Sequence, residues 1–152
     1  MPGRSKRSKK RSAASSTPQP DLTFFLDECL GTRHVPDALL GAGANVVVHQ
    51  QYFANQPGIG DSEWIAEIAA HDWVVLTKDK SFKRRELERQ AIFAGGVRAF
   101  FLSATNLSGP EQAVIFVKAL PRIRRLCATH AGPFIARITR MAEVDIVLRP
   151  KR

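Results

Sequence analysis

Two apolar segments of this chain each lead directly into an aspartate. Residues 23–26 precede Asp27, and residues 73–77 are followed one position later by Asp79. A third aspartate, Asp61, opens an amphipathic stretch between them. Parallel strands of an open α/β sheet place their carboxyl ends along one edge, so we expect the three carboxylates to converge there. Because such carboxylates repel one another and a hard divalent cation such as Mg²⁺ relieves that repulsion, the pattern predicts cation-assisted phosphate chemistry.

The elements that would position these aspartates alternate between strands and helices. Short apolar runs predict strands over residues 23–26, 45–49, 73–77 and 97–102. Helical spacing predicts helices over 32–42, from 61 onwards, over 82–93 and over 109–130, the last kinked or broken at Pro121. Residues 50–60 are typical of a loop, and 134–138 with 144–148 predict a hairpin that turns near 141–143. We therefore predict an α/β fold with a mostly parallel sheet and a C-terminal antiparallel hairpin; a strand order of second, first, third, fourth would make the strands before Asp27 and Asp79 neighbours.

Composition and charge indicate one domain preceded by a tail. The chain has 152 residues and a net charge of +9. Residues 1–20 contain basic residues and no acidic ones, which predicts a disordered tail that binds polyanions or only aids solubility. The folded domain should span residues 21–152. Because no apolar run reaches the ~20 residues that span a bilayer, and two distant cysteines fit a reducing compartment, we expect a cytoplasmic protein with no membrane partner.

Each acidic residue also has a purely structural interpretation. Asp61 is a good helix N-cap, and Asp79 fits an ordinary turn or cap. Asp27 closes a buried strand, where an acid without a partner is expensive. Glu28 and Glu63 are possible additional acids, although Glu28 should point to the other side of its strand.

A basic cluster surrounds Asp79. Its members are Lys78, Lys80, Lys83, Arg84 and Arg85. The cluster can steer a nucleic-acid backbone toward the acids and balance the carboxylates, or it can be an ordinary solvated helix face. Among the four histidines, only His34 is expected near the predicted crevice.

Three motifs together resemble one known family. They are Phe-Leu-Asp-Glu at residues 25–28, Gly-Asp-x-Glu-x-Ile at 60–65, and Val-Leu-Thr-Lys-Asp-Lys-Ser-Phe at 75–82. With the order of strands and helices over residues 22–105, this pattern resembles PIN-like domains, and more narrowly those related to VapC-type toxins of bacterial toxin–antitoxin pairs. The resemblance implies a three-layer sandwich and a ribonuclease that uses Mg²⁺ or Mn²⁺. It also implies an RNA substrate, a cognate antitoxin and a homodimer, with Asp27, Asp61 and Asp79 as metal ligands.

One feature departs from that family pattern. PIN nucleases usually carry a further glutamate on an early helix, whereas residues 29–60 here hold only Asp37. Either Glu28 or Glu63 substitutes, or the site is reduced. The competing hypothesis is thus a catalytically weak nucleic-acid-binding module that uses the basic residues. A phosphoacceptor receiver-like switch fits less well, because Ser103 in the fourth predicted strand is followed by no matching strand-terminal lysine.

Overall fold

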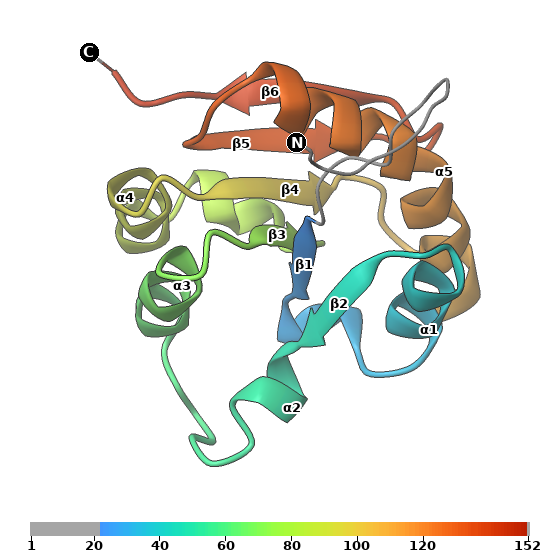
Figure 1. The fold of residues 1–152 in the computed structure, drawn as a ribbon, viewed down its shortest axis with the longest axis horizontal. Helices are drawn as coiled ribbons and strands as arrows, with labels where there is room; N and C mark the ends of the chain where they lie inside the picture. Colours follow the sequence, from blue (N-terminus) through green and yellow to red (C-terminus); the bar gives the residue numbers. More distant parts are fainter. Residues whose placement is uncertain (1–21, 152) are drawn as a thin grey trace, which may run out of the picture.

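A six-stranded sheet forms the middle of the molecule (Figure 1). The structure, a computed structural model, describes residues 22–151, apart from the side chains of Phe82 and Lys83. The strands are β1 (Thr23–Leu26), β2 (Asn45–Val48), β3 (Val74–Thr77), β4 (Arg98–Leu102), β5 (Phe134–Ile138) and β6 (Val144–Leu148). Their order is β2-β1-β3-β4-β5-β6; all neighbours are parallel except the antiparallel pair β5–β6. The predicted mostly parallel sheet and final hairpin are confirmed, and β1 and β3 are neighbours. The predicted basic tail lies outside the described residues.

Helices cover both faces of the sheet, which makes three layers (Figure 1). One face carries α1 (His34–Gly41) and α5 (Gly109–Thr129); the other carries α2 (His49–Tyr52), α3 (Asp61–Ala69) and α4 (Glu86–Ala94). Two short 3₁₀ turns, η1 (Glu28–Leu30) and η2 (Lys80–Lys83), follow β1 and β3. In the region described, none of the helices combines the length and apolar character needed to traverse a bilayer.

Alternating side chains of the central strands supply both cores. In β1, Phe24 and Leu26 pack with α1 and α5, whereas Phe25 packs with α3. The same alternation continues in β3, where Val75 faces α3 and Leu76 faces the opposite core. Because central parallel strands are buried on both faces, they appear in the sequence as continuous apolar runs.

The segment after β2 differs from the prediction. The strand ends at Val48, one residue before its predicted end, and α2 runs from His49 into the stretch 50–60 that was predicted to be a loop. His49 is buried, with its ring 5.2 Å from that of Phe53 and 5.6 Å from that of Trp64. Aromatic packing across distant segments therefore fixes a helical turn that the local pattern does not indicate.

One helix start and one internal helix break were also predicted incorrectly. The basic segment predicted as a helix over 82–93 forms η2 first and then α4, which begins at Glu86. The predicted break at Pro121 is wrong, since α5 continues to Thr129. Pro121 is exposed while Leu120 and Ile123 are buried in the core, so core packing holds the helix together across the missing hydrogen bond.

Candidate active site

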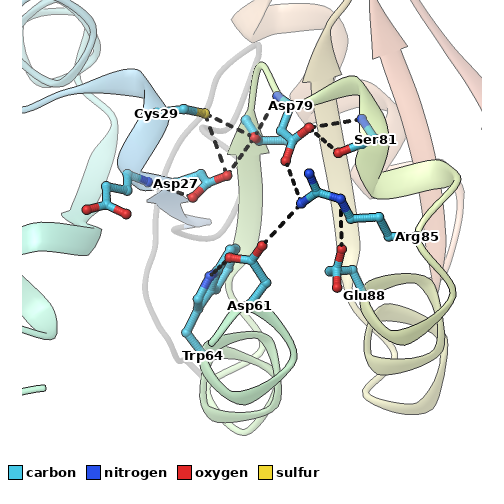
Figure 2. Close-up of polar contacts among 10 residues, drawn as sticks. Asp27, Cys29, Asp61, Trp64, Asp79, Ser81, Arg85 and Glu88 are labelled. Atoms are coloured by element: carbon cyan, nitrogen blue, oxygen red, sulfur yellow. Dashed lines mark hydrogen bonds and ion pairs between the residues drawn. The ribbon is translucent and has the colours of Figure 1, made fainter. Parts of the chain in front are cut away.

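The adjacent ends of β1 and β3 bring Asp27 next to Thr77. Leu26 is paired with Leu76 in parallel register, and the Asp27 amide donates to the Leu76 carbonyl at 3.0 Å. The Thr77 hydroxyl, which is fully buried, donates to Asp27 Oδ2 at 2.8 Å. Asp27 therefore lies at the carboxyl edge of the sheet, as predicted (Figure 2).

Asp27 is an unusual place for a charge, because only 7% of its surface is exposed. Burial raises the pKa of its carboxyl above the usual 3.8, and the nearby Asp61 charge raises it further. Hydrogen bonds from the Thr77 hydroxyl and the Glu28 amide, the latter 2.7 Å from Oδ1, act in the opposite direction. The Asp27 and Asp61 charges are thus close enough to repel each other.

Thr77 also connects Asp27 to Asp79. Its Oγ1 accepts a hydrogen bond from the Asp79 amide at 3.0 Å. Asp79 Oδ1 in turn accepts from the Ser81 amide at 3.0 Å and from the Ser81 hydroxyl. Asp79 therefore caps η2 through Oδ1, which confirms the structural interpretation, while Oδ2 faces Arg85 (Figure 2).

Asp61 reaches the same place from the start of α3. The N-cap position belongs to Gly60, whose amide donates to Glu63 Oε1 at 2.9 Å, so the interpretation of Asp61 as the cap is wrong. Asp61 Oδ1 instead accepts a hydrogen bond from the indole N–H of Trp64 at 2.9 Å. Its Oδ2 faces Arg85, and the carboxylate remains available outside the helix.

The Arg85 guanidinium lies among these acids (Figure 2). Its Nη1 is 3.4 Å from Asp79 Oδ2 and 3.6 Å from Asp61 Oδ2. Its Nε is 3.6 Å from Glu88 Oε1. Arg85 and its neighbours were predicted to steer a nucleic-acid backbone and to balance the carboxylates; in this structure Arg85 neutralises carboxylates from α3, the end of β3 and α4.

Glu88 is a site residue that the sequence analysis did not single out. It lies in α4, is only 9% exposed, and its buried Oε1 has no hydrogen-bond partner in the described part of the chain. Its position three residues after Arg85 was a usable signal, since i and i+3 side chains share a helix face. The predicted helix over 82–93 already contained both residues, but it gave no indication that Arg85 lies among the acids.

The carboxylate oxygens of this site are suitable ligands for a hard cation, but their present positions do not form a shared binding site. Aspartate oxygens are what Mg²⁺ and Mn²⁺ prefer. Within residues 22–151, however, no three histidine, cysteine, aspartate or glutamate side chains are grouped so that they hold one ion. As they lie, Asp61 and Asp79 both face the Arg85 guanidinium.

Comparison with known proteins identifies the family. A family model described as "PIN like domain" matches residues 22–104, more than half of the chain. The chain belongs to the PIN-like domain family. It is also 28% identical over 114 residues to a Mycobacterium tuberculosis H37Rv protein named "Putative ribonuclease VapC45", covering 74% of this chain and 82% of that protein. No solved structure matches the chain significantly.

The two further acids predicted for this PIN-like site do not join it. Glu63 is exposed and its Oε1 is engaged by the Gly60 amide. Glu28 is exposed in η1 and lines a separate hollow together with His49 and Phe53. In the arrangement described, the acid nearest to Arg85 besides Asp61 and Asp79 is Glu88.

The remaining basic residues of the cluster lie close to Asp79 in the sequence. Lys78, Lys80 and Arg84 are exposed. Lys78 lines a polar hollow with Arg33 and His34, beside the start of α5; this hollow includes Cys29 but none of the three aspartates. The side chain of Lys83 lies outside what the structure describes.

Cys29 contacts the buried acid directly. Its sulfur lies 3.3 Å from Thr77 Oγ1 and 3.6 Å from Asp27 Oδ2, although the residue as a whole is exposed. Desolvation, followed by the Asp27 charge, raises the pKa of this thiol to about 11. The side chain is therefore a neutral neighbour of Asp27, and the thiol is a poor nucleophile at neutral pH.

Proposed function

We propose that this protein is a metal-dependent endoribonuclease that hydrolyses RNA phosphodiester bonds. The observation that carries the proposal is the gathering of Asp27, Asp61 and Asp79 at the carboxyl edge of the sheet of a PIN-like domain. The name of the mycobacterial relative, which calls that protein a ribonuclease, supports the same activity. A bound Mg²⁺ or Mn²⁺ would supply an activated water and stabilise charge on the scissile phosphate.

The residues of this chain prepare the site for such chemistry in distinct ways. Thr77 orients Asp27 and Asp79 through two hydrogen bonds, and Trp64 fixes the Asp61 carboxylate. Burial of Asp27 excludes water from one side of the site. These supports fix the orientation of oxygen donors from three separate elements, which limits the rearrangement that cation binding would require.

We assign RNA-backbone contact to the exposed cations at the rim. Lys78, Lys80 and Arg84 are exposed and flank Asp79 in the sequence, and they would offer positive charge to phosphates without reading sequence. We propose the same role for Lys83 from its position in the sequence. This assignment predicts binding that weakens steeply with salt and does not depend on divalent metal.

We further propose that the protein is the toxin of a toxin–antitoxin pair and acts as a homodimer in the cytoplasm. The resemblance to VapC-type toxins supports the toxin role. Growth arrest on induced expression, relieved by the product of a neighbouring reading frame, would support this role. Normal growth with a full level of folded protein would contradict it. Light scattering of the purified full-length protein measures its molar mass in solution and so tests whether it is a dimer.

The direct test of the chemistry is RNA cleavage by the full-length protein. Wild type should cleave RNA with Mn²⁺ and not in EDTA, and Asp79→Asn should lower cleavage by at least about 100-fold while RNA binding persists. Glu143→Gln is the matched control, since Glu143 is exposed just before β6, which lies at the opposite end of the sheet from β1 and β2. If Asp79→Asn cleaves at the wild-type rate, these acids are not the catalytic site.

One observation favours a second function, that of an RNA-binding module with little activity. The acids of the described structure hold Arg85, and no three metal-ligating side chains are grouped there. Such a module would bind RNA with the same salt dependence, cleave none with Mn²⁺, and show no change on Asp79→Asn. The cleavage assay therefore separates the two functions.

A further inference from the structure

Arg85 occupies the centre of the acidic site in the way that a bound cation would. Its guanidinium approaches Asp61 and Asp79 with one nitrogen and Glu88 with another, at 3.4–3.6 Å. These carboxylates come from α3, the end of β3 and α4, so a single side chain joins three elements (Figure 2). Without it, the site would hold carboxylates facing one another with their charge uncompensated.

The environment of Glu88 gives independent evidence that the acidic site requires a cation. A buried carboxylate is costly unless it is paired or hydrogen-bonded. Yet the Oε1 atom of Glu88 has no hydrogen-bond partner among the described residues, and the Arg85 ion pair is its compensation. The local structure therefore tolerates an anionic oxygen there only because a cation is adjacent.

The geometry also indicates that the Arg85 side chain can move away from the carboxylates. Charge-assisted hydrogen bonds in proteins are usually about 2.7–2.9 Å long, whereas the contacts of Arg85 are all longer. Its side chain is 53% exposed and is attached to the short link between η2 and α4. Such exposed pairs contribute little individually, so displacing the guanidinium into solvent requires only modest free energy.

We propose that Arg85 is an internal counter-ion that a divalent cation must displace before it binds the acids. The inference rests on the proposed function, because it takes Asp61 and Asp79 as cation-binding residues. Arg85 then sets the metal affinity of the site: it stabilises the metal-free protein and weakens metal binding by competition. Once released, its guanidinium lies at the rim with Lys78 and Arg84, where it can contact the phosphates of RNA.

The test measures Mn²⁺ binding to full-length protein by calorimetry and by the loss of free-Mn²⁺ electron paramagnetic resonance signal. Arg85→Gln should bind Mn²⁺ about five- to tenfold more tightly than wild type, because the competing ion pairs are absent. Arg84→Gln is the matched control: it removes the same charge one residue away and should change the affinity by less than about twofold. Arg85→Lys, which keeps the charge but lacks the planar fork, should fall between Arg85→Gln and wild type.

Thermal unfolding supplies a second readout that does not depend on activity. In EDTA, Arg85→Gln should melt at a lower temperature than wild type, and saturating Mn²⁺ should raise its melting temperature by more than it raises that of wild type. If Arg85→Gln binds Mn²⁺ no more tightly than wild type does, the counter-ion role is wrong, even if Asp79→Asn abolishes binding. If Asp79→Asn binds Mn²⁺ as wild type does, or if neither wild type nor Arg85→Gln binds it, the proposed metal site itself is wrong.

Discussion

Replacing Thr77 by valine tests whether one buried hydroxyl organises the acidic site. The substitution keeps the shape of the side chain and removes its oxygen. That oxygen donates to Asp27 Oδ2 at 2.8 Å and accepts from the Asp79 amide at 3.0 Å. Thr77 is fully buried, so water cannot replace either bond at its position.

The expected loss of stability follows from these two bonds. A buried hydrogen bond to an ionised carboxylate contributes about 1.5–3 kcal/mol, and an ordinary one about 0.5–1.5 kcal/mol. Thr77→Val should therefore lower the free energy of unfolding by about 2–4 kcal/mol. For a domain of this size that corresponds to a fall in Tm of about 5–15 °C. Thr77→Ser, which keeps the hydroxyl and loses one methyl group, should lose only about 1 kcal/mol.

The loss should also depend on pH in a defined direction. The Thr77 hydroxyl lowers the pKa of Asp27, so its removal raises that pKa further above 3.8. A carboxyl whose folded pKa exceeds its unfolded value loses stability as pH rises through that window. The difference between Thr77→Val and wild type should therefore be largest at neutral pH, and should shrink as acid protonates Asp27 in both proteins.

Urea unfolding at several pH values, with NMR titration of the Asp27 carboxyl carbon, measures both effects. A Thr77→Val protein that is as stable as Thr77→Ser at neutral pH would refute the reasoning. An unchanged Asp27 pKa in the valine variant would refute it as well, because the hydroxyl would then not contact the carboxylate in solution.

Two further predictions concern neighbours of the acids. Cys29, whose thiol pKa is raised to about 11, should react with a thiol reagent at pH 8 about 100-fold more slowly than a thiol of pKa 9. Asp27→Asn should accelerate this reaction because it removes the adjacent charge, and peptide mapping of the labelled protein measures the rate. Trp64→Phe removes the indole donor to Asp61 and should lower kcat/KM for RNA about tenfold in a cleavage assay, whereas an unchanged kcat/KM would mean that the indole does not position Asp61.

The positions of Asp27 and Asp79 at the carboxyl ends of the strands were predictable, because the apolar runs that precede them are local sequence features. Asp27 follows a strand whose residues are buried on both faces, and so does the Thr77–Asp79 segment. The apolar runs fixed the strands, and the parallel crossover connections fixed the order that makes β1 and β3 neighbours. The convergence of Asp27 and Asp79 on Thr77 follows from that order.

The roles of Arg85 and Glu88 were not predictable in the same way. Basic residues 83–85 have no apolar periodicity, so the sequence alone did not distinguish the start of a helix from a 3₁₀ turn. The observed turn ends at Lys83 and α4 starts at Glu86, which directs Arg85 toward Asp61 and Asp79 instead of along a solvated helix face. Ion pairs between distant segments decide this orientation, and no periodic pattern in the sequence indicates them.

The central claim is that Asp27, Asp61 and Asp79 grip one divalent cation, and iron-directed backbone cleavage tests it most directly. Fe²⁺ substituted for Mg²⁺ generates hydroxyl radicals with ascorbate and peroxide, and these cut the chain beside the bound ion. The fragments should end near residues 27, 61 and 79, and excess Mn²⁺ or Asp79→Asn should abolish all three cuts together. Cuts at only one of these positions, cuts elsewhere, or an intact chain would contradict the claim.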